Sequence, residues 1–129
     1  MFNVSHVHHV AIICSDYLVS KRFYSEILGF RILKETYREE RQSYKLDLAI
    51  NDQQQIELFS FPSPPARPSR PEAQGLRHLA FAVENLEDCI KHLNQQGVIT
   101  EDIRLDELTG KRFTFFADPD DLPLELYEQ

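Results

Sequence analysis

The sequence of 129 residues predicts an α+β fold in which one βαβββ module occurs twice. His9 and His78 lie 69 positions apart, and each is followed two residues later by an alanine. Glu57 and Glu125 lie 68 positions apart, each within a run of the form apolar–Glu–Leu–aromatic. In both halves, one segment with helical spacing is followed by extended segments, and residues typical of turns lie between these segments. Because these landmarks keep one order and nearly one offset, we infer a duplicated unit.

The first half begins with an alternating strand at residues 7–13 and a helix at residues 17–28. Ser15 or Asp16 can cap the first turn of this helix, and Gly29 ends it. The remaining extended segments of the first half are predicted at residues 30–37, 43–50 and 55–61.

The second half repeats this order, with a strand at residues 76–82 and a helix at residues 86–96 that Asn85 caps. A turn before the last strand ends in Asp121, a residue type that tolerates left-handed backbone better than most. The remaining extended segments are predicted at residues 99–105, 112–117 and 122–127.

A proline-rich segment separates the halves, with five prolines within residues 62–71. Such a segment forms neither a helix nor a central strand, and a stiff linker is the simplest interpretation. The alternative is that Arg67 and Arg70 also border the site and attract an anionic substrate. We expect one domain over residues 1–129, with module 1 at about 5–61, the linker at 62–74 and module 2 at about 75–129.

The composition indicates a soluble globular protein with a net charge of −7. An acidic chain without a basic stripe argues against nucleic acid and anionic membranes as partners. No apolar run is long enough to span a bilayer, and no secretory signal is evident. Cys14 and Cys89 form no CxxC pair and read as reduced thiols, so we expect a cytoplasmic protein.

Strand alternation places two imidazoles and two carboxylates on equivalent faces of the two modules. Glu57 and Glu125 each lie between apolar residues that face the other way, and an unpaired carboxylate there is costly. With His9 and His78 they form a set of two nitrogen and two oxygen donors. This set suits Ni, Co, Zn, Mn or Fe with open positions for water or substrate. The alternative is that the histidines are structural and the glutamates solvated.

Several motifs resemble the vicinal oxygen chelate superfamily, the glyoxalase, bleomycin resistance and dioxygenase group. His-His-Val-Ala-Ile followed by Ser-Asp, Phe-Tyr and Leu-Gly-Phe spans residues 8–30, and Phe-Ala-Asp-Pro-Asp-Asp-Leu-Pro-Leu-Glu-Leu-Tyr spans residues 116–127. Gly-Leu-Arg-His-Leu-Ala-Phe at residues 75–81 is similar to a branch of small bacterial proteins described as lactoylglutathione lyase-like.

The resemblance implies that the paired modules form a half-open mixed β-barrel around one metal site. It implies His9, Glu57, His78 and Glu125 as the metal ligands, and Glu57 favours the glyoxalase-like branch. The resemblance also implies a homodimer, in which the site lies within one subunit or is completed across the interface.

The leading hypothesis is a metal-dependent lyase or isomerase of the lactoylglutathione lyase type, acting on a small oxygenated substrate. A metal-stabilised enediolate would form when Glu57 or Glu125, with Glu125 preferred, removes a proton next to a carbonyl. One divalent ion is expected, with Ni, Zn or Co ahead of Fe or Mn, and glutathione is a candidate co-substrate. The substrate contacts that we expect are Phe59, Phe61, Phe115, Tyr127, Arg70 and Lys111.

Two other functions fit the same scaffold. One is a different metalloenzyme of this superfamily, either a dioxygenase or a thiol transferase. The other is a non-catalytic protein that binds a small molecule or an antibiotic, and the complete set of four metal-ligand residues argues against it.

Overall fold

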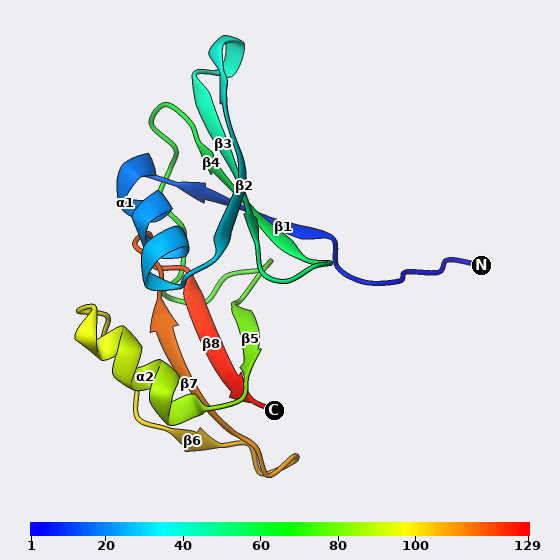
Figure 1. The fold of residues 1–129 in the computed structure, drawn as a ribbon, viewed down its shortest axis with the longest axis vertical. Coiled ribbons are helices and arrows are strands. Elements are labelled where there is room, and N and C mark those ends of the chain that lie inside the picture. The colour runs from blue at the N-terminus through cyan, green and yellow to red at the C-terminus, as the bar shows by residue number, and fades with distance from the viewer. The chain divides into compact units, whose positions relative to one another are not determined.

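The computed structural model describes residues 1–129, which form two compact units, Met1–Ala66 and Arg67–Gln129. Each unit contains one four-stranded mixed sheet and one principal helix, and neither sheet closes into a barrel. The predicted α+β class and the duplicated βαβββ order are therefore confirmed (Figure 1).

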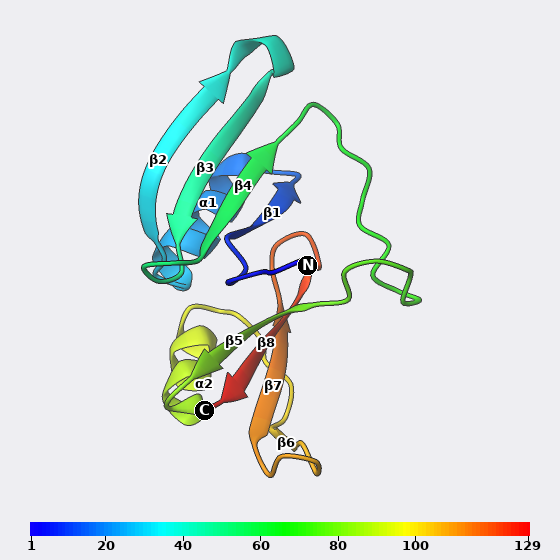
Figure 2. The ribbon, with the colours of Figure 1, turned by 90° about the vertical axis from the view of Figure 1, so that its right-hand side faces the viewer.

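Unit 1 is a sheet of order β1-β4-β3-β2, with one face covered by α1 (Figures 1 and 2). Strand β1 runs parallel to β4, and the other neighbouring strands are antiparallel. A π-helical turn at Phe23–Ile27 continues α1, and a 3₁₀ turn at Glu39–Arg41 joins β2 to β3. The elements are β1 (His9–Cys14), α1 (Tyr17–Arg22), β2 (Arg31–Arg38), β3 (Ser43–Ala49) and β4 (Gln55–Ser60).

Helix α1 and the π-helical turn that continues it together cover the helix predicted at residues 17–28, up to Ile27. Asp16 is the cap, and its carboxylate accepts a hydrogen bond from the Val19 backbone N–H. Gly29 has a φ of 77°, the left-handed conformation that terminates many helices.

Unit 2 repeats the arrangement with the order β5-β8-β7-β6 and α2 against one face of the sheet. Strand β5 is parallel to β8, as β1 is to β4. The cap of α2 is Asn85, whose side chain accepts from the Asp88 N–H. The elements are β5 (Leu79–Val83), α2 (Leu86–Gln95), β6 (Arg104–Leu105), β7 (Arg112–Ala117) and β8 (Pro123–Glu128).

The prediction of a strand over residues 99–105 was wrong for most of its length, since β6 contains only Arg104 and Leu105. The Glu101 N–H donates to the Phe115 carbonyl, but the Glu101 carbonyl accepts from the Thr114 hydroxyl. A side chain thus occupies the carbonyl that a backbone N–H would bond in a sheet, and the backbone hydrogen bonds to β7 do not continue through residue 101.

Each unit has its own core between helix and sheet. The strands that carry the glutamates contribute Ile56 and Leu58 in unit 1, and Leu124 and Leu126 in unit 2, all buried. These side chains fix which face of each strand turns away from the core. No helix of the structure has the length and apolar character needed to cross a membrane.

The last turn supports the sequence argument for Asp121, whose φ is 65°. The Asp118 carboxylate accepts hydrogen bonds from the backbone N–H groups of Asp120 and Leu122. This turn therefore keeps its left-handed residue without a glycine.

Candidate metal centre

Strand alternation presents one glutamate from each unit on the sheet face that the helix does not cover. Glu57 lies between buried Ile56 and Leu58, and Glu125 lies between buried Leu124 and Leu126. Both carboxylates are mostly shielded, with side-chain exposures of 13% and 12%. A largely shielded carboxylate needs a cationic or hydrogen-bonding partner, which makes its neighbours informative.

In unit 1, that partner is His9. Its Nδ1 lies 3.5 Å from Oε2 of Glu57. Lys45 lies on the other side of the same carboxylate, with Nζ 3.8 Å from Oε1 of Glu57 and 3.5 Å from Oδ1 of Asp47. Oδ1 of Asp47 is buried and accepts no hydrogen bond. Unit 1 thus presents two carboxylates, one imidazole and one ammonium group in a single cluster.

In unit 2, the partner is His78. Its Nε2 lies 3.4 Å from Oε1 of Glu125, and its ring packs edge-on against Phe115, with 5.0 Å between the centroids. An Arg77 guanidinium nitrogen lies 3.3 Å from Nδ1 of His78. Nδ1 of His78 thus faces Arg77, and Nε2 is the ring nitrogen that faces Glu125.

The two pairs share one register. Ala11 pairs with Glu57 across β1 and β4, and Ala80 pairs with Glu125 across β5 and β8. Each histidine lies two residues before that alanine. The repeat in the sequence therefore corresponds to a repeated local geometry.

The donor chemistry of each pair fits a divalent ion. Nitrogen–oxygen separations of 3.5 and 3.4 Å exceed the usual hydrogen-bond range of about 2.7–3.2 Å. Adjacent nitrogen and oxygen ligands about 2.0–2.2 Å from zinc lie about 3.0–3.4 Å apart, close to these values. No group of three or more His, Cys, Asp or Glu side chains is arranged to hold a metal ion. Each unit contributes one pair, and the set of four ligands remains a prediction.

The predicted aromatic contacts of unit 1 form a stack beyond Glu57. Phe59 and Phe61 lie nearly parallel, with 6.1 Å between their centroids. The Arg38 guanidinium lies 4.8 Å from the Phe59 centroid and 5.6 Å from that of Phe61. Arg41 covers Phe61 at 5.4 Å, so cations face both rings.

In unit 2, Tyr127 is the counterpart of Phe59, since each lies two residues after its glutamate. Its ring stacks on Phe113 at 6.2 Å, and its hydroxyl donates to Asp106 at 2.8 Å. This hydrogen bond is the main reason why the pKa of the Asp106 carboxyl is lowered. Lys111 is exposed near the start of β7, and its role stays a prediction.

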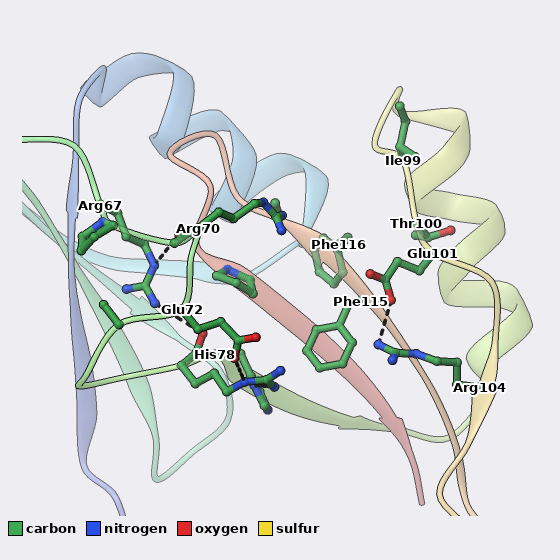
Figure 3. A pocket seen from close by; sticks show the side chains of 16 residues that line it. Arg67, Arg70, Glu72, His78, Ile99, Thr100, Glu101, Arg104, Phe115 and Phe116 are labelled. Carbon is green, nitrogen blue, oxygen red and sulfur yellow. Dashed lines mark hydrogen bonds and ion pairs between the residues drawn. The ribbon is translucent and has the colours of Figure 1, made fainter.

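A cavity of about 480 Å³ lies in unit 2, and His78 is part of its wall (Figure 3). Phe115 and Phe116 line it from β7, while Arg70 and Arg104 line it from the linker and from β6. Two of the expected contact residues, Phe115 and Arg70, thus border one cavity with a predicted metal ligand. Its remaining lining residues are Arg67, Pro68, Ser69, Glu72, Ala73, Arg77, Ile99, Thr100, Glu101, Ala117 and Pro123.

The linker folds onto unit 2 through Arg67, which supports part of the alternative interpretation of this segment. The Arg67 guanidinium donates to the Leu76 carbonyl at 2.5 Å and to the Arg77 carbonyl at 3.3 Å. The Ser69 hydroxyl donates to the Asp121 carbonyl at 2.7 Å. Arg67 therefore has a positioning role directly before His78.

Lys45, Asp47 and Arg104 were not predicted as site residues from the sequence. Alternation with buried Leu46 and Leu48 signals that Lys45 and Asp47 lie on the Glu57 face. Strand alternation extended back to His8 would point that side chain away from His9, but His8 is exposed and its Nδ1 lies 2.9 Å from Nδ1 of His9. The reason is that β1 begins only at His9, so strand alternation does not extend to His8.

Comparison with known proteins connects this geometry to a family. Residues 6–126 match the family described as the Glyoxalase/Bleomycin resistance protein/Dioxygenase superfamily. The chain is 65% identical over 123 residues to the uncharacterized protein YwkD of Bacillus subtilis, covering 95% of this chain and 96% of YwkD. It is 61% identical over 129 residues to the uncharacterized protein YaeR of Escherichia coli, covering 100% of both chains.

A solved structure shows the same fold. The glyoxalase family protein from Enterococcus faecalis is 54% identical and has a TM-score of 0.89, with 96% of this chain and 98% of that chain covered. The resemblance drawn from the sequence motifs is thereby confirmed at the level of the superfamily.

Proposed function

Because the chain belongs to the Glyoxalase/Bleomycin resistance protein/Dioxygenase superfamily, we propose that it is a metal-dependent lyase or isomerase of the glyoxalase I type. The proposed substrate is a small molecule with two adjacent oxygens. The observation that supports this most directly is the histidine–glutamate pair, which recurs at one register with separations of 3.5 and 3.4 Å.

The proposed ligands are His9, Glu57, His78 and Glu125, and they hold one divalent ion. Two neutral imidazoles and two carboxylates balance the charge of such an ion, with Ni, Zn or Co preferred and Fe or Mn as alternatives. When bound, the ion supplies Lewis-acid stabilisation of negative charge on the substrate oxygens.

We assign the general base to Glu125. Glu57 lies between His9 and Lys45, whereas Glu125 has His78 as its only ion-pair partner. Glu125 is therefore the carboxylate with fewer restraints. It removes the proton from the carbon next to the carbonyl and returns it to the neighbouring carbon, so the reaction is a rearrangement without net oxidation.

The remaining groups exclude water and orient the substrate. Phe59 and Phe61 in unit 1, with Phe115 and Tyr127 in unit 2, supply apolar walls for the reacting carbons. Arg70 and Lys111 supply positive charge toward an anionic part of the substrate or of glutathione. Superfamily members commonly form dimers, and we propose a homodimer as the working assembly.

The first test is the metal content of the purified full-length protein, without added metal and after dialysis against Ni, Co or Zn. We expect about one ion per chain in the wild type and a clear loss in His78→Gln. The matched control is His6→Gln, since His6 is exposed near the N-terminus and should leave the metal content unchanged. An assay with the hemithioacetal of methylglyoxal and glutathione then measures isomerisation with each metal.

A wild-type protein that takes up none of these metals would contradict the proposal. So would a His78→Gln variant that retains the full metal content and the folded state.

A further inference from the structure

The cavity of unit 2 differs in charge from the rest of the molecule. Four arginines and two glutamates line it, a formal charge of +2 in a chain whose net charge is −7. A concave site of the opposite sign concentrates anions against the average charge of the surface. The cavity is therefore suited to an anionic ligand, and not only to apolar contact with Phe115 and Phe116.

Arg104 is positioned to donate hydrogen bonds to an anion. Its guanidinium lies 5.1 Å from the Phe113 centroid and 5.3 Å from that of Phe115, so two rings hold its plane. One of its terminal nitrogens, Nη2, donates to Glu101 at 2.8 Å. Since a guanidinium carries five N–H donors, this bond leaves donors of Arg104 available for a ligand.

Arg70 supplies a second cation from the linker. Its single ion pair is with Asp121 at 3.6 Å, beyond good hydrogen-bond distance, and its side chain is 76% exposed. An exposed pair of this kind contributes little stability and is easily exchanged for a ligand. Arg67 differs, because its Nη2 donates to two backbone carbonyls and its Nε donates to the Ser69 hydroxyl, which fixes the guanidinium in place.

The uncharged residues of the cavity indicate the shape and polarity of the remaining part of the ligand. Phe115 and Phe116 supply apolar surface from β7, and the labelled side chains show Arg70 and Arg104 on opposite sides of these rings (Figure 3). His78 lies in the same wall, in edge-on contact with Phe115. A ligand that fills this space has an apolar body and an anionic end.

We propose that the cavity binds a small organic anion whose carboxylate or phosphate group is held by Arg104, while Arg70 adds positive charge on the other side of the rings. Its apolar part lies against Phe115. Identification of this anion as the substrate rests on the proposed function, because it places the molecule beside His78. Binding of the anion itself requires no metal.

The test uses the full-length protein after treatment with EDTA, titrated by calorimetry with benzoate and separately with inorganic phosphate. Benzamide serves as the neutral analogue of benzoate. The variant is Arg70→Gln combined with Arg104→Gln, and the matched control is Arg31→Gln on β2, an exposed arginine of unit 1. We expect the double variant to bind at least about tenfold more weakly, because charge-assisted hydrogen bonds are lost, while Arg31→Gln binds like the wild type.

The two ligands separate the two sources of anion. Arginine-dependent binding of benzoate alone identifies a carboxylate site, and binding of phosphate alone identifies a phosphate site. Binding of neither anion, equal binding of benzamide, or equal affinity in a folded double variant would overturn the proposal. The metal-free protein keeps this result separate from the metal analysis, so either proposal can fail alone.

Discussion

The two units carry the same histidine–glutamate pair in different surroundings. In unit 1, Asp47 lies opposite Glu57 across the strands, and Lys45 contacts both carboxylates. In unit 2, the residue opposite Glu125 is Phe115. Duplication has thus kept the pair and its register while one cross-strand neighbour became charged and the other aromatic.

In the proposed function, this difference separates a carboxylate that holds the metal, Glu57, from one that transfers the proton, Glu125. A lysine near Glu57 adds a second cationic contact, which restrains the position of this carboxylate. An aromatic neighbour restrains Glu125 less and excludes water from it, which suits a group that takes and returns a proton. Residues with equal positions in a repeat therefore need not have equal roles.

The largest expected effect distinguishes these roles. Glu125→Gln removes the proposed base and should lower kcat by about 10²–10⁴. Glu57→Gln should instead act mainly through metal affinity, lowering it at least about tenfold. Hemithioacetal turnover and metal titration, measured on both variants, separate the two outcomes.

Glu84→Gln is the control for this pair, since Glu84 is exposed between β5 and α2. Equal kinetic losses in Glu57→Gln and Glu125→Gln at saturating metal would show that the two units share the chemistry evenly.

A smaller effect tests whether the hydrophobic cores of the two units are equally stable, although the sheet faces that carry the glutamates differ. Ile56 and Leu124 each directly precede a glutamate, and both are fully buried. Truncation of either to alanine should reduce the free energy of unfolding by about 2–5 kcal/mol through lost burial and the remaining cavity. Urea unfolding of both variants provides the measurement, and a loss below about 1 kcal/mol at one site would break the symmetry of the cores.

The smallest effect concerns an ion-pair network of unit 2. Arg112 contacts Glu87 at 2.5 Å and Glu128 at 2.7 Å, and these hydrogen bonds lower the pKa of both carboxyls from 4.5. A lowered folded-state pKa adds stability above pH 4.5 that is lost as pH falls through the folded-state value. Arg112→Gln should therefore flatten the acid limb of the Tm profile.

Thermal unfolding from about pH 7 to about pH 3 follows this limb. Arg31→Gln is again the control. If Arg31→Gln flattened the acid limb of the Tm profile as much as Arg112→Gln does, a specific role for the network would be refuted.

Much of the fold could be predicted because local signals agree with it. Asp16, Gly29 and Asn85 mark helix ends, and alternation around Glu57 and Glu125 marks the buried faces. The strand at residues 99–105 was predicted too long, because the Thr114 hydroxyl donates to the Glu101 carbonyl, a contact between distant residues that periodicity does not encode.

The site was predictable only in part. The duplicated motif indicates which histidine accompanies which glutamate, because register within each module follows the repeat. Lys45 escaped notice, since its contact with Glu57 depends on pairing between β3 and β4. The cavity escaped as well, because its walls combine the linker, β6 and β7.

The hold of Arg67 on the carbonyls of Leu76 and Arg77 has a consequence for how the chain tolerates length variation. Connecting segments ordinarily accept insertions readily, but this one is anchored on its C-terminal side. Extra residues, affinity tags or permuted termini belong before Arg67, in residues 62–66. Past that point they would displace the backbone that carries His78, so tolerance changes abruptly within one short connection.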